Sequence, residues 1–398
     1  MTPAMKHPDL AAPAVVKTIG QRALMVGLAT SVVAVILAFR NADDFYHAYL
    51  ISFMDWLGVA LGSMAILMLR HLTKGGWGMI IRRILGAAMR TIPLMTLLFV
   101  PVFLGLARIY PRWADPSKIA NTEHMRYITQ HYLNSPRFLA CAALYFAVWN
   151  LLSFFLTKWS REQDSPASPD HTNRFKALSG PGLILYGFTI SFAAIDWVMS
   201  IDPSWISTIY GLLILIGQLI SALCFAVVVE RVLFNYKPMS ELLKTEYVHD
   251  HGKFMLAFIM VWAYFSFSQW LIIWSGNLPE EITWYKARLD HGWGGVGLFL
   301  VVFQFAVPFV FLISRSFKRD ITRLVWVAAW LMCMRYVDLY WLIEPNYSAS
   351  FRVTAADIVV PFAMGGLWLW YFCRNLASMA LVPAYDPFAS EVLEPAHE

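Results

Sequence analysis

Seven polar or ionisable side chains lie within or at the ends of apolar segments that are long enough to cross a membrane. They are Asp55, Asp196, Gln269, Arg335, Asp338, Glu344 and Asp357. An ionisable group at the centre of a bilayer helix costs roughly 2.5–3.5 kcal/mol, so each of these groups needs a partner or a function. Carboxylates at such positions could accept protons from a quinol, form the outer half of a proton path, or line a small solute vestibule.

Their depths predict a common location. Asp55 lies nine residues into the second predicted span, roughly 13 Å from its outer end at 1.5 Å per residue. Asp196, Arg335 and Asp338 also fall in the outer halves of their spans, so we expect all four to line one polar cavity. Two structural alternatives remain. Arg335 and Asp338 are three residues apart on one helical face and could form an internal ion pair, and Asp196 could cap a helix end.

A second group of ionisable residues lies near the inner ends of two spans. It consists of Glu230, His249, Asp250 and His251. A hydrated helix start is the commonest structure for such a group, and the functional alternative is proton uptake.

Composition identifies the elements that must position these groups. Hydrophobic residues make up 59% of the 398 residues and charged residues 14%, whereas soluble domains have about 45–50% and 25%. This composition predicts an all-α polytopic membrane protein and excludes disordered, collagen-like and disulfide-framework classes. We expect a tail at 1–22, a membrane domain at 23–377 and a second tail at 378–398. The ten predicted spans are 23–39, 46–69, 85–107, 137–157, 178–201, 206–229, 254–275, 293–314, 324–343 and 355–373.

Basic residues predict the orientation of these spans. If the N-terminus is inside, 20 of the 31 Lys and Arg residues lie in inner segments and nine in outer loops. Cytoplasmic loops carry the excess of Lys and Arg. We therefore expect both termini in the cytoplasm. The even number of spans agrees, because it places the two termini on the same side.

Cysteine and histidine positions argue against a metal cofactor bound by this chain. Cys141, Cys224, Cys333 and Cys373 have no CxxC or zinc-site spacing. The ten histidines lie in loops or at helix ends, whereas axial haem ligands are expected deep in facing helices. We expect no covalently bound cofactor, and any electron handling to use an organic molecule or a partner subunit.

Glycine patterns are better explained by helix packing than by nucleotide binding. The G-x-G-x-x-G at Gly292, Gly294 and Gly297 opens a predicted membrane helix and lacks the βαβ unit that a dinucleotide site needs. Gly58 and Gly62 form a GxxxG motif, which predicts a close helix contact.

Four long segments resemble NrfD-like, polysulfide-reductase-type membrane subunits. They are ALSGPGLILYG (177–187), DWVMSIDPSWISTIYG (196–211), FSQWLIIWSGNLPEEITWY (267–285) and RYVDLYWLIEPNY (335–347). Among these subunits, the chain is most similar to the smaller of the two in bacterial alternative complex III. The resemblance covers about residues 20–377.

This resemblance implies two four-helix bundles with two further helices. It also implies a quinol:cytochrome c, or other periplasmic acceptor, oxidoreductase complex in a respiratory or photosynthetic chain of the bacterial cytoplasmic (inner) membrane. The chain would contribute a proton path and contacts to menaquinone or ubiquinone, without being catalytic alone. The implied partners are a sister NrfD-like subunit, an iron–sulfur subunit and c-type haem subunits, with no nucleic acid. Asp196, Arg335, Asp338 and Glu344 lie within the matched segments.

Two other functions remain open at this point. A stand-alone solute or ion transporter often shows internal repeats and helices broken at mid-membrane, and neither is evident in the sequence. A purely structural anchor for redox subunits would need none of the polar groups to be functional.

Overall fold

The prediction of an all-α multi-pass membrane protein is confirmed. The computed structural model describes residues 10–120, 122–165, 169–383, 385–389 and 392. Over these ranges the regular secondary structure is helical, and the only extended pairing is an isolated bridge between Ala11 and Ala380. Nine helices in the described part of the chain are long and apolar enough to cross a bilayer.

These nine helices correspond to nine of the ten predicted spans. Seven of them are formed by one long helix each: α1 (Ala14–Arg40), α2 (Ala42–Thr73), α9 (Ser135–Glu162), α10 (Thr172–Trp197), α11 (Tyr210–Leu233), α13 (Thr245–Gly276) and α19 (Ala355–Leu376). Helix α10 is followed by the short helix η2 (Met199–Ile201). The other two spans are composite: Gly76–Leu104 consists of α3 (Gly76–Met89), α4 (Ile92–Leu98) and α5 (Val100–Leu104), and Trp293–Ile313 consists of α15 (Trp293–Leu300), η3 (Val301–Ala306) and α16 (Val307–Ile313).

The remaining predicted span, 324–343, forms α18 (Ile321–Ile343). Arg335 and Asp338 make this helix less apolar than the other nine. Its 23 residues give a length of about 34 Å, which is enough to cross the hydrocarbon core. The connections contain α6 (Leu106–Ile109), α7 (Pro111–Ala114), α8 (Glu123–His131), α12 (Met239–Leu242), α14 (Pro279–Leu289), α17 (Arg315–Lys318) and η4 (Glu344–Asn346).

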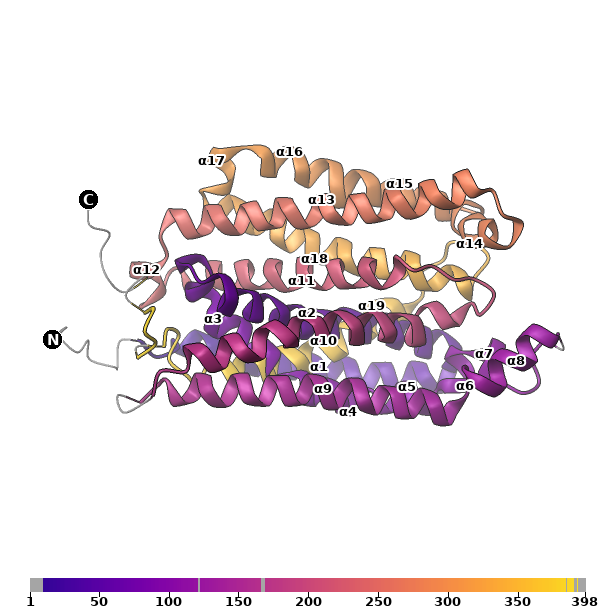
Figure 1. The fold of residues 1–398 in the computed structure, drawn as a ribbon, viewed down its shortest axis with the longest axis horizontal. Coiled ribbons are helices and arrows are strands. Elements are labelled where there is room, and N and C mark those ends of the chain that lie inside the picture. Colours follow the sequence, from indigo (N-terminus) through magenta and orange to yellow (C-terminus); the bar gives the residue numbers. More distant parts are fainter. Residues whose placement is uncertain (1–9, 121, 166–168, 384, 390–391, 393–398) are drawn as a thin grey trace.

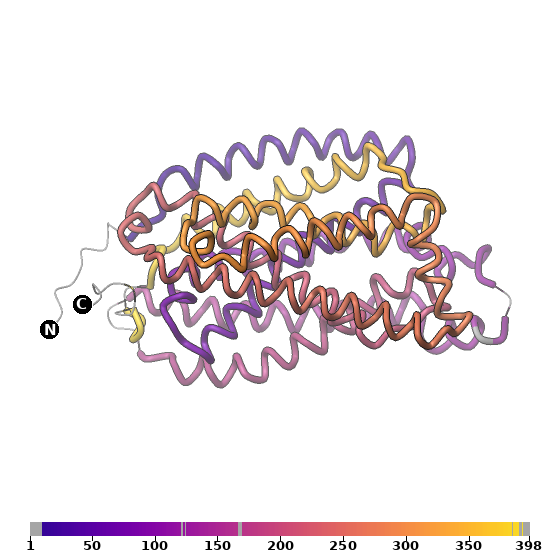
Figure 2. The backbone as a smooth tube through the Cα atoms, turned by 90° about the horizontal axis from the view of Figure 1, so that it is seen from above, coloured from indigo at the N-terminus to yellow at the C-terminus, as the bar shows by residue number. Residues whose placement is uncertain are grey.

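The long helices pack as two groups of four with an additional pair (Figure 1). The first bundle contains α2, α3–α5, α9 and α10, and the second contains α11, α13, α15–α16 and α18. Helices α1 and α19 run side by side along one edge (Figure 2) and pack against α2. This is the arrangement that the resemblance implied.

The segments next to the two termini lie at the same end of the molecule, which we call the termini end. The amide of Leu381 donates to the carbonyl of Leu10 at 2.8 Å there. Helices α12 and α17 lie at the same end, whereas α7, α8 and α14 lie at the opposite end, which we call the loop end (Figure 1). Parts of both predicted tails, residues 1–9 and 393–398, lie outside the described residues.

The two bundles meet where α2 crosses α11. A Cβ atom at Gly62 would lie 2.1 Å from the carbonyl oxygen of Gln218, so only glycine permits this approach. Gly58 lies against the side chain of the same glutamine. The GxxxG motif therefore makes the close helix contact that the sequence predicts.

We predict that fusions after Asn277 and after Arg319 place a reporter on opposite sides of the membrane. Asn277 precedes α14 at the loop end, and Arg319 follows α17 at the termini end. A pair of fusions with alkaline phosphatase and green fluorescent protein measures this directly. Equal activity at the two positions would contradict the helix arrangement described above.

We further predict that Gly62→Ala lowers the melting temperature of the purified protein. Overpacking a close contact typically costs about 1–3 kcal/mol. Gly187→Ala is the matched control, because Gly187 is also helical and has no atom within 4 Å of an added Cβ. Intrinsic tryptophan fluorescence during heating measures both variants. A loss of stability for Gly187→Ala equal to that of Gly62→Ala would show that the crossing is not the cause.

Candidate functional site

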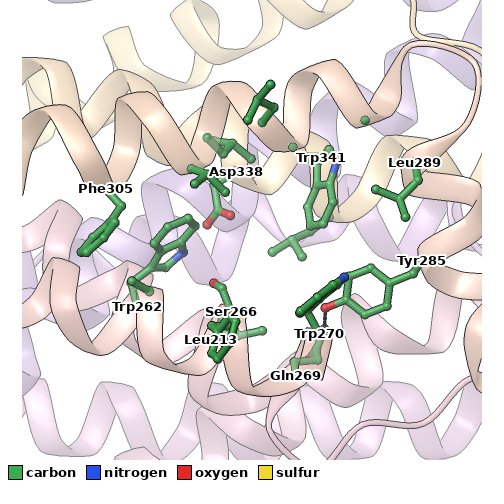
Figure 3. A pocket seen from close by; sticks show the side chains of 18 residues that line it. Leu213, Trp262, Ser266, Gln269, Trp270, Tyr285, Leu289, Phe305, Asp338 and Trp341 are labelled. Atoms are coloured by element: carbon green, nitrogen blue, oxygen red, sulfur yellow. Dashed lines mark hydrogen bonds between the residues drawn. The ribbon is translucent and has the colours of Figure 1, made fainter. Parts of the chain in front are cut away.

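An apolar cavity of about 580 Å³ lies in the second bundle between α13, α15–η3 and α18 (Figure 3). Aromatic side chains form much of its wall, namely Trp262, Trp270, Phe305 and Trp341. Its rim includes Phe267, Leu298 and Val301, which are 58%, 66% and 55% exposed. Because these exposed side chains are apolar and belong to spanning helices, the cavity opens sideways to the bilayer.

One ionisable group, Asp338 of α18, reaches this cavity (Figure 3). Its carboxylate forms an ion pair with Arg335 one turn earlier, and both side chains are buried. The sequence left open whether these two residues form an internal ion pair, and the structure contains that pair. Removing one member of a buried pair usually costs about 3–5 kcal/mol, because the other charge is left uncompensated.

The position of Arg335 depends on a glycine in α11. A Cβ at Gly217 would lie 2.1 Å from the guanidinium carbon of Arg335. The guanidinium therefore lies against bare backbone of α11. Asp55 of α2 is half-buried and interacts electrostatically with the same arginine. Arg335 thus connects Asp338, which reaches the cavity, to an acid of the first bundle.

Trp262 and Gln304 complete the surroundings of Asp338, since both side chains lie close enough to its carboxylate to influence it electrostatically. Gln304 belongs to the π-helical segment η3. With its amide in the orientation that satisfies its neighbours, it donates to the carbonyl of Met334 at 3.2 Å and accepts from the indole of Trp262 at 3.1 Å. π-Helical turns occur frequently at functional sites. Here the turn directs an amide towards α18.

The loop end of the cavity carries a second polar group. Gln269 of α13 accepts from the hydroxyl of Ser207 at 3.1 Å and donates to the hydroxyl of Tyr285 at 3.4 Å. Tyr285 comes from α14, which follows α13 across a tight turn at Asn277. The cavity therefore has a carboxylate near one end and an amide–phenol pair near the other, with aromatic walls between them (Figure 3).

Arg288 fixes α14 over the loop end. It donates to the carbonyls of Trp284 at 3.0 Å and Leu342 at 2.7 Å, and its guanidinium lies 3.5 Å from the centre of the Trp284 ring. Burial lowers the pKa of Arg288 to about 9. This arginine ties the connection after α13 to the end of α18, so it holds Tyr285 in place.

Asp196 does not lie with Arg335 and Asp338. Its carboxylate accepts from the hydroxyls of Tyr145 at 2.7 Å and Tyr132 at 3.0 Å, and lies 3.3 Å from a guanidinium nitrogen of Arg137. These partners come from α9 and the segment before it, in the first bundle. Three donors satisfy this buried carboxylate, so Asp196 fastens the loop end of α10 to α9. Of the four residues expected to line one cavity, Asp338 lines the cavity described above, Arg335 and Asp55 lie behind it, and Asp196 lies apart from all three.

Glu344 and Asp357 lie at the loop end, around the connection from α18 to α19. Asp357 accepts from the amide and the hydroxyl of Thr354, both at 2.8 Å, in a capping box that starts α19. Glu344 is buried in η4, 3.7 Å from a guanidinium nitrogen of Arg352, which also pairs with Asp44 at 2.7 Å. Burial raises the pKa of Glu344 to about 8, and the charge of Asp357 adds to this effect.

The second predicted group separates into two parts at the termini end. His251 is fully buried, with Nδ1 3.0 Å from a carboxylate oxygen of Glu230 and Nε2 2.9 Å from the carbonyl oxygen of Trp77. Both ring nitrogens face acceptors, so the His–Glu pair must hold one proton between its members in addition to the proton on Nε2. His249 is half-buried, and Asp250 pairs with Lys253 at 2.9 Å. Only Glu230 and His251 thus form a buried proton-holding pair.

Neither family models nor curated protein sequences match this chain. Within the ranges that the structure describes, no group of three or more His, Cys, Asp and Glu residues is arranged to hold a metal ion. The function proposed below therefore rests on the geometry of the cavity and of the Arg335–Asp338 ion pair.

Sequence reasoning identified Arg335, Asp338 and Gln269 but missed most of the cavity. Trp262 and Trp341 are two of 17 tryptophans, and nothing in their spacing separates them from lipid-facing residues. Tyr285 and Arg288 lie between the predicted spans 254–275 and 293–314, and no local pattern indicates that this connection covers a site. Gln304 lies near the middle of the predicted span 293–314, and nothing in the sequence links it to Asp338. The Pro308 four residues after Gln304 was the one available signal, because proline disturbs the preceding helical turn.

We predict that Glu344→Gln makes the melting temperature less dependent on pH. The pKa of Glu344 in the folded protein, about 8, is above its ordinary value of 4.5. Its neutral form is therefore fully stabilising below about pH 4.5, and this stability is lost as the pH rises to about 8. Thermal unfolding should show that the melting temperature falls by several degrees more between pH 5 and pH 8 in the wild type than in the variant.

The control for this experiment is Glu280→Gln, because Glu280 is exposed in α14 at the same end of the molecule. Its pH profile should match that of the wild type. Identical profiles for Glu344→Gln and the wild type would contradict the proposed titration of Glu344.

Proposed function

We propose that this chain is a non-haem membrane subunit of a quinol-oxidising complex, in which the cavity of the second bundle binds the ring of a membrane quinone. The observation that carries this proposal is an aromatic cavity that opens to the bilayer and holds a buried carboxylate, that of Asp338. The resemblance to NrfD-like subunits leads to the same function. On this basis the protein would lie in the bacterial inner membrane with a sister NrfD-like subunit, an iron–sulfur subunit and c-type haem subunits.

The chemistry of a quinol fits the arrangement of the cavity. A hydroquinone is a flat ring with two hydroxyls at opposite ends and an isoprenoid tail that stays in the lipid. Trp262 and Trp341 provide apolar faces for the ring, and the open rim at Leu298 and Val301 gives the tail a route into the bilayer. The carboxylate of Asp338 and the Gln269–Tyr285 pair provide hydrogen-bonding groups for the two oxygens.

Oxidation of a hydroquinone to a quinone releases two electrons and two protons. The electrons would pass to the iron–sulfur and haem centres of the partner subunits. The protons would leave through groups of this chain, and Asp338 is the carboxylate in the cavity wall that can accept one of them. Arg335 links Asp338 electrostatically to Asp55, which provides a further acceptor in the neighbouring bundle.

The Glu230–His251 pair supports a separate role at the termini end. Because it is buried and must hold a shared proton, it can take up and release protons without a large movement of either side chain. If the termini are cytoplasmic, this pair would contribute to proton uptake from the cytoplasm. The depth of the remaining polar groups, nearer the loop end, suits proton release on the other side.

The apolar character of the cavity favours a quinone over a polar transport substrate. A transporter for a polar solute needs a hydrated path, and its site typically lies between half-helices whose ends face the substrate. Here the rim is apolar and faces lipid at Phe267 and Leu298. A purely structural anchor would not need a lipid-facing cavity that contains a charged group. The following experiment distinguishes the quinone site, the transporter and the anchor.

We predict that Gly297→Leu lowers quinol turnover of the assembled complex about tenfold or more. Gly297 lines the cavity, and an added side chain would project towards Trp341, 3.4 Å from the Cβ position. Gly295→Leu is the matched control, because Gly295 lies on the same helix, is exposed, and has no atom within 4 Å of an added Cβ. Labelling by a photoreactive quinone measures binding independently of turnover.

The complex is purified in mild detergent, and subunit identification with a haem difference spectrum establishes its assembly. Assembled Gly297→Leu complex with unchanged labelling and turnover would exclude quinone binding in this cavity and leave the anchor function. Purification of the chain without redox partners, together with binding of a polar solute, would favour a transporter.

A further inference from the structure

A second groove, distinct from the cavity above, lies towards the termini end of the first bundle. It has a volume of about 930 Å³ and lies between the third span and α9, with Tyr371 of α19 at one side. Leu151 and Phe154 form an apolar wall and are 57% and 60% exposed, so this wall faces the lipid chains of the bilayer. Three cations, Arg90, Lys158 and Arg161, line the same groove.

A break in the third span creates space for the groove. Helix α3 ends at Met89, α4 begins at Ile92, and Pro93 lies in the first turn of α4. Because proline has no N–H, the carbonyl of Met89 loses its helical donor. The hydroxyl of Ser153 in α9 donates to this carbonyl at 3.4 Å. The break is therefore stabilised by the opposite wall of the groove, and Arg90 lies at the break.

Two of the three cations of the groove repel each other. Arg90 and Arg161 are close enough for their charges to interact unfavourably. In the described part of the chain none of the three cations forms an ion pair with a carboxylate. The acid that lines the groove, Glu162, is 2.7 Å from Nε2 of His171. An anion between the three cations would relieve this repulsion.

We propose that this groove is a binding site for an anionic phospholipid, with the headgroup phosphate between Arg90, Lys158 and Arg161 and an acyl chain along Leu151 and Phe154. The charge of the groove is complementary to a phosphodiester, and its apolar wall is complementary to an acyl chain. A soluble anion would leave the apolar wall without an occupant. A neutral lipid would leave the cations unneutralised.

The length of the groove agrees with this occupant. Along α9 the lining residues extend from Ala147 to Glu162, which corresponds to about 22 Å at 1.5 Å per residue. One leaflet of the hydrocarbon core is about 15 Å thick, half of a roughly 30 Å core. The groove therefore accommodates a headgroup and most of one acyl chain. Basic pockets between membrane helices near one membrane surface bind anionic headgroups in this way.

Native mass spectrometry of the purified protein, with any subunits that accompany it, tests the proposal. The delipidated protein is titrated with phosphatidylglycerol or phosphatidylcholine. We expect retention of phosphatidylglycerol at least fivefold above that of phosphatidylcholine, and a fall of at least fivefold in this retention for Arg161→Gln and for Arg90→Gln. Arg315→Gln is the matched control, because Arg315 is exposed at the same end but outside the groove.

Arg161 and Lys158 are exposed on α9, so Lys158→Gln with Arg161→Gln tests the site even if Arg90→Gln does not fold. Equal retention of the two lipids, or retention unaffected by the groove variants but lowered by Arg315→Gln, would overturn the proposal. Inorganic phosphate is a second probe in a thermal-shift assay. If it stabilises the protein as much as phosphatidylglycerol does, the groove binds a soluble anion and not a lipid.

Discussion

One turn of α11, at Gly217 and Gln218, connects the two bundles, and the rest of the membrane domain depends on it. On one side the backbone of Gln218 lies against Gly62 of α2, and on another the guanidinium of Arg335 lies against Gly217. The side chain of Gln218 also accepts from the hydroxyl of Tyr186 in α10 at 2.9 Å. Helix packing in a membrane has little hydrophobic driving force, so close backbone contacts and satisfied polar groups must supply the specificity.

This constraint explains how a charged pair can exist beside a cavity that opens to lipid. Arg335 is covered by the backbone of α11 and paired with Asp338, so its charge never faces hydrocarbon. Asp338 is oriented by the same pair, and Trp262 and Gln304 lie beside its carboxylate. The cavity therefore has one fixed carboxylate among aromatic walls. Such a site combines apolar affinity with a group that can exchange a proton.

The other buried charges differ in how fully nearby groups compensate them. Asp196 accepts from three nearby donors and Asp357 from two, and these bonds account for their burial without a functional role. Glu230, paired with His251, and Glu344, beside Arg352, have fewer or more distant partners, and burial raises the pKa of Glu344. The basic groove at Arg90 is a third case, for which we propose that a lipid phosphate supplies the compensating charge.

The sequence by itself determined the all-α membrane fold, the ten helical segments and the close helix contact at Gly58 and Gly62, and it offered the pairing of Arg335 with Asp338 as one of two alternatives. Each follows from local patterns: apolar length, the Gly58–Gly62 spacing and the i,i+3 relation. The resemblance supplied the grouping of helices into two bundles. Only the tertiary structure decided that Asp196 lies apart from Asp338, that Trp262 and Gln304 surround this carboxylate, and that Arg90, Lys158 and Arg161 share one groove. Depth along a helix fixes one coordinate of a residue, whereas the direction in which it faces depends on how helices distant in the chain pack around it.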